Sequence, residues 1–352
     1  MTTKSNKIQY LDTLRTFATL GVIIIHITSA LVNMTWNRNI GYWWIGNIVE
    51  SAMRFAVPMF LLLSGATMLG KEYKLSEFYK RRLMRVLVPF LFWMIIYWIF
   101  RWTMLPPKQQ PHEFYATLHW AVTLFLKEGI SKHFWYIYMI LCFYLLIPFV
   151  GKVLRKCNNT SVLFVLITWV LLAFALRKMP INMYGWAGDY GSKLLSYSLY
   201  FGYLVLGFYL NRISLPWGRM RLPAIVIFIL TVAVSSVVTY LLSFDTHKLN
   251  MSIYSYLSVN TIVQTIALFI CIKELKIDNK IVSWTQIKIS NYSYGIYLVH
   301  IIVIGILFRQ GIYWNFAHPI FSLPLLMVLV LVISFGIIWL LRKIPMGKYI
   351  SG

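Results

Sequence analysis

An arginine and a histidine lie eleven residues apart in an apolar, membrane-length run that extends from Asp12 to Asn33. At a helical rise of about 1.5 Å per residue, Arg15 and His26 are expected to differ by about 16 Å in depth. Ionisable side chains in a membrane span are costly, and they usually face a protein interior and mark function. We therefore treat His26 as a candidate catalytic group. The alternative is a histidine that only hydrogen-bonds a neighbouring helix.

A pair of opposite charges, Glu50 and Arg54, is spaced four residues apart in the next apolar run. The first two spans are antiparallel, and the loop between them is centred near residue 37. His26 lies eleven residues before that centre and Glu50 thirteen residues after it, so the two are expected to share a depth. Glu50 is thus a candidate to orient or polarise His26, as a carboxylate does for a general-base imidazole. An ion pair within the helix explains the same spacing, and the sequence does not decide between the two roles.

Three arginines, Arg81, Arg82 and Arg85, follow the second apolar run. Arg81 and Arg85 are expected to share one helix face, which Arg82 flanks. Guanidinium groups bind phosphate in bidentate fashion, so the cluster is a candidate phosphate site at the membrane surface. Contact with anionic lipid headgroups is the alternative for such a basic loop.

The run HFWY places polar groups on an aromatic stripe at the outer start of the fourth span. Interfacial anchoring explains Trp135 and Tyr136 but not His133. The segment 178–194 is rich in Gly, Tyr and Trp and holds one acid, Asp189. That composition fits contact with sugar rings, and it fits an ordinary aromatic belt equally well.

A further polar run, SNYSYGIYLVH, extends from Ser290 to His300. Small polar residues at helix interfaces often serve only to pack and hydrogen-bond neighbouring helices. We expect His300 to be a hydrogen-bonded packing residue rather than a catalyst.

The composition places the chain among multi-pass membrane proteins. Of its 352 residues, 59% are hydrophobic and 12% are charged, with a mean hydropathy of +0.69, whereas a soluble domain is about a quarter charged. The net charge of +23 is carried by short loops between apolar runs, which membrane topology explains, so nucleic-acid binding is rejected. The three cysteines are far apart and form no metal-ligand spacing, and neither a metal site nor a disulfide is expected.

Ten apolar runs are long enough to cross about 30 Å of hydrocarbon. The sequence predicts spans at 11–32, 43–68, 86–104, 134–151, 161–177, 195–211, 222–243, 254–272, 290–308 and 320–341. A re-entrant or interfacial helix is expected between 105 and 132. The loops and tails on the side of the termini hold 21 basic residues against ten on the other side, so both termini are predicted to be cytoplasmic. The prediction is an all-α polytopic membrane protein with a single domain over residues 1–352.

These motifs together resemble acyltransferase family 3 of bacterial membrane proteins. The resemblance covers nearly the whole chain and is closest to stand-alone ten-span members that O-acetylate surface glycans. It is carried by five elements in order: R-x10-H (Arg15 to His26), V-P-x-F-x-x-x-S-G (Val57 to Gly65), R-R-x-x-R-x-x-x-P (Arg81 to Pro89), H-x-W-Y (His133 to Tyr136) and S-Y-G-I-Y-L-x-H (Ser293 to His300). One departure is Phe60 with Leu61, where the family carries an aromatic pair before the Ser-Gly.

The resemblance implies acyl transfer, usually acetyl, from acyl-CoA to a hydroxyl of a cell-envelope carbohydrate or lipid-linked glycan at the bacterial inner membrane. It implies His26 as the catalytic histidine, and Glu50 is a candidate partner from its depth alone. The expected acyl-CoA site comprises Arg15, Ser64, Arg81, Arg82 and Arg85. The expected acceptor site comprises Arg54, His133, Trp135, Tyr136 and Asp189. Acyl-CoA is a co-substrate, and no permanently bound cofactor is expected.

The pantetheine arm of CoA is an extended chain of roughly 15–20 Å, close to the depth difference between Arg15 and His26. A thioester could thus reach His26 from the cytoplasm while the acceptor approaches from outside. His26 is expected to act as general base; a covalent acyl-histidine intermediate is the competing mechanism. The opposing class is a transporter or flippase of a lipid-linked glycan, against which the chain lacks an inverted repeat.

Overall fold

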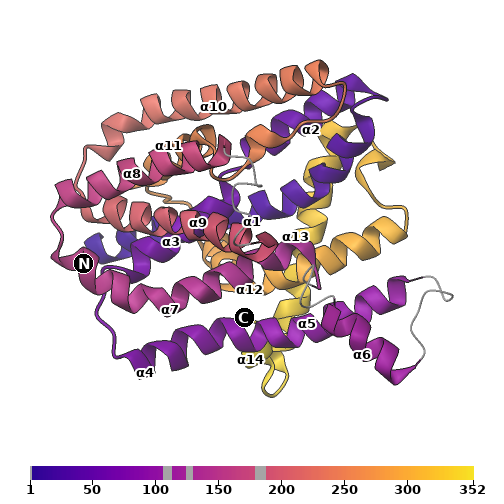
Figure 1. Ribbon diagram of the computed structural model, residues 1–352, viewed down its shortest axis with the longest axis horizontal. Coiled ribbons are helices and arrows are strands. Elements are labelled where there is room, and N and C mark those ends of the chain that lie inside the picture. Colours follow the sequence, from indigo (N-terminus) through magenta and orange to yellow (C-terminus); the bar gives the residue numbers. More distant parts are fainter. Residues whose placement is uncertain (1, 106–112, 124–129, 179–187) are drawn as a thin grey trace.

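A computed structural model describes residues 2–105, 113–123, 130–178 and 188–352, and this part of the chain is helical without strands (Figure 1). The elements are α1 (Thr2–Thr35), α2 (Ile40–Ala52), α3 (Ala56–Met68), α4 (Leu75–Phe78), the π-helical turn η1 (Tyr79–Leu83), α5 (Met84–Met104), α6 (Phe114–Thr123), η4 (Lys132–Phe134), α7 (Trp135–Lys156), α8 (Asn159–Lys178), α9 (Gly188–Arg212), α10 (Trp217–Asp245), η6 (Ser252–Tyr254), α11 (Val259–Ile272), α12 (Lys280–Arg309), η7 (Trp314–Phe316), α13 (Pro319–Lys343) and α14 (Gly347–Ile350).

Eight segments of the described residues are long and apolar enough to cross a membrane. They correspond to eight of the predicted spans, and they make the protein a multi-pass membrane protein. The sixth and eighth predicted spans correspond to α9 and to the short helix α11 of 14 residues. A total of ten spans and a cytoplasmic location of both termini stay predictions. Helix α6 lies in the segment 105–132, and its predicted re-entrant or interfacial position stays a prediction. Residues 106–112 and 124–129 lie outside the described residues.

The second span is broken, although the apolar run predicts one helix over 43–68. Helix α2 ends at Ala52 and α3 begins at Ala56, with Arg54 in the intervening turn. Pro58 explains the break, because it has no N–H to donate to the carbonyl of Arg54 and its ring clashes there. Irregular backbone at membrane depth is tolerated only where it is buried in protein or lines a cavity.

Helix α1 lies within the bundle and packs against α2, α3, α12 and α13. In Figure 1, α10 runs along one edge of the molecule and α5 along the opposite edge, with α1 between them. Helices α1 and α12 run parallel, since Arg15 contacts Ser290 near their starts and His26 contacts His300 farther along. The position of a contact along α1 therefore indicates the depth of the neighbouring polar group that makes it.

Glycines allow the backbones of α3 and α9 to come into contact. A Cβ atom added at Gly65 would overlap the backbone of Leu204, and one at Gly207 would overlap the backbone of Leu62. Small residues support close helix packing in membranes, where no hydrophobic effect drives helices together. Gly65 therefore has a packing role, whereas the neighbouring Ser64 faces the cavity described below.

Replacing Gly65 with Ala is expected to destabilise the protein by ~1–3 kcal/mol, because the close-packed interface with α9 must open. The measurement is thermal or denaturant unfolding of the purified protein in one detergent. Gly336→Ala is the matched control: no atom lies within 4 Å of its added Cβ, and a helical Ala in place of Gly gains ~0.5–1 kcal/mol. Equal midpoints for the two variants would contradict this account of the interface.

Candidate functional site

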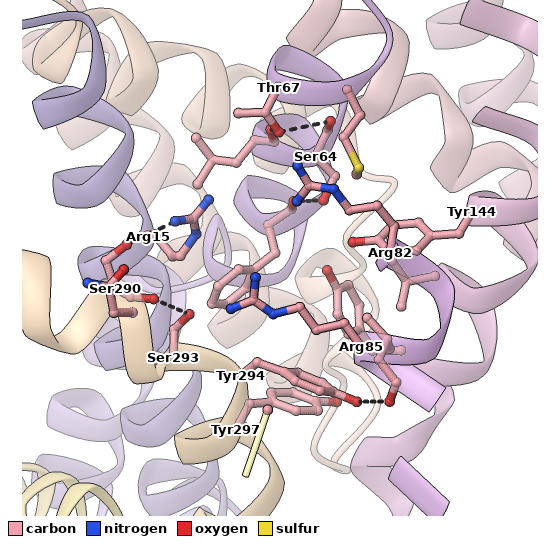
Figure 2. A pocket seen from close by; sticks show the side chains of 18 residues that line it. Arg15, Ser64, Thr67, Arg82, Arg85, Tyr144, Ser290, Ser293, Tyr294 and Tyr297 are labelled. Carbon is pink, nitrogen blue, oxygen red and sulfur yellow. Dashed lines mark hydrogen bonds between the residues drawn. The ribbon is translucent and has the colours of Figure 1, made fainter. Parts of the chain in front are cut away.

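A cavity of about 340 Å³ collects arginines from separate helices. Arg15 comes from α1, Arg82 from the π-helical turn η1 and Arg85 from α5. Figure 2 shows Arg82 and Arg85 extending toward the side of the cavity that carries Arg15 and Ser290. The other polar lining residues are Ser64, Thr67, Tyr136, Tyr144, Asn291, Ser293, Tyr294 and Tyr297. We name this space the arginine cavity.

Two of the three arginines face the arginine cavity. The sequence predicts a shared helix face for Arg81 and Arg85, but Arg82 and Arg85 line the cavity, and Arg81 forms an exposed ion pair with Glu77 at 3.0 Å. Residues three apart are neighbours on a helix just as residues four apart are. The spacing alone therefore does not decide between Arg81 and Arg82.

The arginine cavity carries more positive than negative charge. Arg15 donates a hydrogen bond to Ser290 at 2.9 Å and lies 3.6 Å from Asp12, which accepts a hydrogen bond from the same serine at 2.6 Å. Within the described part of the chain, no carboxylate forms an ion pair with Arg82 or Arg85. Two guanidinium groups thus remain to bind an anion, with five N–H donors each.

A tyrosine beside the basic loop stays uncharged. Burial raises the pKa of Tyr73, and the nearby Arg82 and Arg155 act in the opposite direction more weakly. The phenol is therefore neutral near pH 7 and does not neutralise the arginines.

Three histidines from separate elements meet one layer beyond the arginine cavity. The ring of His26 lies 5.2 Å from that of His300 and 6.3 Å from that of His133, and the latter two are 5.4 Å apart. Tyr297, which lines the arginine cavity, lies 5.4 Å from His133 and 5.7 Å from His300. We name His26, His133 and His300 the histidine cluster.

His300 is buried and hydrogen-bonded, as expected of a packing residue. His300 is fully buried, and its Nδ1 lies 2.7 Å from the carbonyl oxygen of Tyr297. Because a carbonyl oxygen only accepts, Nδ1 carries the proton and Nε2 of the neutral ring is an acceptor. Among the described residues, that Nε2 has no hydrogen-bond partner, and neither has Nε2 of His133. Both nitrogens can therefore form a hydrogen bond with a ligand or a water.

The histidine cluster does not have the arrangement of a metal centre. Among the described residues, no group of three His, Cys, Asp or Glu side chains is placed to hold a metal ion. The chemistry available to the cluster is proton transfer and hydrogen bonding.

Glu50 forms the ion pair with Arg54 that was one of its two expected roles. The carboxylate also accepts a hydrogen bond from Thr28, two residues beyond His26 on α1. Its side chain is 3% exposed and that of Arg54 is 11% exposed. No hydrogen bond joins Glu50 to His26 in the described part of the chain. A role of Glu50 in orienting His26 stays a prediction.

The residues expected to bind the acceptor do not form one site. His133 belongs to the histidine cluster, and Tyr136 lines the arginine cavity. Trp135 packs against the rings of Tyr197, Tyr200 and Tyr256 at 5.6–6.0 Å. The guanidinium of Arg54 lies 5.9 Å from the Tyr256 ring, which links it to the same aromatic group. The side chain of Asp189 lies outside the described residues.

A family model described as an acyltransferase domain matches residues 8–343, nearly the full length of the chain. The chain belongs to acyltransferase family 3. No curated protein and no solved structure matches it significantly. The matched region of this acyltransferase contains the arginine cavity residues of α1, α5 and α12 together with the complete histidine cluster.

The buried pair of the acyltransferase offers a test of stability. Arg54→Gln is expected to cost ~3–5 kcal/mol of unfolding free energy, because it leaves the Glu50 carboxylate buried without its cation. The double variant with Arg54→Gln and Glu50→Gln should recover part of that loss. Unfolding in detergent measures the free energy of unfolding of the double variant and of both single variants. Strict additivity of the two single effects would show that the pair is not coupled.

Proposed function

We propose that this acyltransferase transfers an acetyl group from cytoplasmic acetyl-CoA to a hydroxyl of a cell-envelope carbohydrate at the bacterial inner membrane. The observation that carries the proposal is the position of the arginine cavity next to the histidine cluster. The family supplies acyl transfer as the reaction class. The donor and the acceptor are inferred from the chemistry of the two groups of residues.

The arginine cavity suits the polyanionic end of CoA. Guanidinium groups bind phosphate oxygens through paired N–H donors, and no carboxylate of the described residues forms a competing ion pair with Arg82 or Arg85. Its volume of about 340 Å³ is within the range of small-molecule sites, about 300–1,000 Å³. The predicted distribution of basic residues supports a cytoplasmic location of this cavity, on the side where CoA is found.

His26 is proposed to act as the general base. It takes the proton of the attacking hydroxyl as the new C–O bond forms at the thioester carbonyl. The C–S bond then breaks, and the thiolate of CoA takes up the proton that His26 holds. An imidazole is suited to this role because it binds and releases a proton near neutral pH.

Replacing both Arg82 and Arg85 with Ala is expected to raise the Kd for acetyl-CoA at least tenfold, because two charge-assisted phosphate contacts are lost. Arg81→Ala is the matched control: its side chain is exposed and pairs with Glu77, so the Kd should change less than twofold. Calorimetry on the purified protein measures both. Unchanged affinity in the double variant would remove acetyl-CoA from this cavity.

His26→Ala is expected to lower acetyl transfer by a factor of about 10²–10⁴, the usual contribution of general-base catalysis. The Kd for acetyl-CoA should stay within twofold, since His26 does not line the arginine cavity. His119→Ala, on the exposed face of α6, serves as the control for loss of a histidine. Radiolabelled acetyl transfer into envelope material provides the rate. Near-normal transfer by His26→Ala would contradict the assigned base.

Labelling also distinguishes direct transfer from a mechanism with an acyl-histidine intermediate. An acyl-histidine intermediate predicts that radiolabel from acetyl-CoA stays on the protein when acceptor is withheld, and that His26→Ala abolishes the label. Direct transfer predicts no protein-bound label in either protein.

A further inference from the structure

A second cavity lies beside His26 on the far side of the histidine cluster. It has a volume of about 40 Å³, and its lining includes His26, Ala30, Leu307, Tyr313, Trp314 and Val330. We name it the outer cavity. No motif considered above accounts for it, and none of the residues expected to bind the acceptor lines it.

The parallel course of α1 and α12 shows where the outer cavity lies relative to the arginine cavity. Along both helices the arginine cavity comes first, at Arg15 and Ser290, and the histidine layer follows at His26 and His300. Ala30 and the α12 segment 304–308 come after that layer. With the termini on the cytoplasmic side, as the basic residues predict, the outer cavity opens toward the external face.

Trp314 lines the outer cavity with a hydrogen-bond donor that is not used. Its indole Nε1 is buried and has no hydrogen-bond partner among the described residues. Ser322 donates to the backbone carbonyl of Trp314, and the ring of Tyr42 packs 6.3 Å from the indole, so the tryptophan is held in place. A buried tryptophan usually finds a partner for its N–H. His26 thus lines a small cavity together with a donor that lacks an acceptor.

We propose that the outer cavity is the subsite for the acceptor hydroxyl, an inference that rests on the proposed function. The hydroxyl oxygen of a carbohydrate accepts a hydrogen bond from Trp314 Nε1, and its proton goes to His26 as the oxygen attacks the thioester carbonyl. The C–O bond forms, the C–S bond breaks, and the released thiolate takes the proton from His26. The products are the acetylated carbohydrate and CoA.

The size of the outer cavity limits what enters it. A single water needs about 10–15 Å³ of such space, so 40 Å³ holds a hydroxyl with the carbon that carries it but not a sugar ring. The ring stays outside, against the aromatic faces of Tyr313 and Trp314, which offer broad apolar contact. The substrate class is therefore a carbohydrate with an accessible hydroxyl on an exocyclic arm or at a ring edge.

Two substitutions test the subsite in the purified full-length protein, with acetyl-CoA as donor and with glycerol and methyl β-D-glucopyranoside as acceptor probes. Ala30→Phe fills the outer cavity, and Trp314→Phe keeps the ring but removes the N–H. Each should lower acetyl transfer to both probes at least tenfold while the Kd for acetyl-CoA changes less than twofold. Ala116→Phe and Trp284→Phe are matched controls at exposed positions and should transfer at the wild-type rate.

Wild-type rates in both Ala30→Phe and Trp314→Phe would overturn the proposal. If the wild-type protein transfers no acetyl group to any probe, the proposed function is at fault, and a labelling experiment then decides on the cavity. In a variant without native cysteines, Ala30→Cys should react with a methanethiosulfonate added outside sealed right-side-out vesicles. Phe316→Cys, in the exposed segment before α13, is the positive control, and Ser64→Cys, in the arginine cavity, should not react. Reaction of Ala30→Cys only from the inside, or no reaction while Phe316→Cys reacts, also overturns the proposal.

Discussion

The fixed separation of Arg15 and His26 along one rigid helix is the constraint on which the site depends. Eleven residues of α-helix set a depth difference of about 16 Å, and a continuous helix from Thr2 to Thr35 cannot shorten it. The other polar groups of the site lie near the depth of Arg15 or near the depth of His26. Ser290 and the arginines of η1 and α5 gather near the first level, and His133 and His300 near the second. The neighbouring helices supply partners at both levels of α1.

Polar groups in an apolar bundle must find protein partners, and the described residues meet this need to different degrees. Glu50 satisfies its carboxylate with Arg54 and Thr28, and Arg54 also lies over the ring of Tyr254 at 4.3 Å. That arrangement lies at the break of the second span, and among the described residues Nε of Arg54 has no hydrogen-bond partner. In the histidine cluster, Nε2 of His133 and of His300 likewise has no partner within the described part of the chain. Such nitrogens leave hydrogen-bonding capacity for a ligand or a water.

Hydropathy predicted eight of the spans because it is a local property of the chain. The break between α2 and α3 had a local signal in Pro58, but the long apolar run favoured one continuous span. The spacing lets both Arg81 and Arg82 share a face with Arg85, and only the tertiary structure shows that Arg82 lines the cavity while Arg81 pairs with Glu77. The place of His300 follows from the parallel packing of α1 on α12, which brings together residues 274 positions apart. The hydrophobic periodicity of the sequence does not indicate tertiary contacts of this kind.

Under the proposed function, the ring of Tyr297 separates the two cavities that take part in one reaction. Its ring lines the arginine cavity and contacts both His133 and His300, and its hydroxyl donates to the backbone carbonyl of His133. A transporter must carry its whole substrate past such a layer, which requires alternating access. Under the proposed function, only a two-carbon acyl group has to pass, while CoA stays inside and the carbohydrate stays outside. One aromatic side chain is thus sufficient to separate the two cavities, because no ionic group has to pass it.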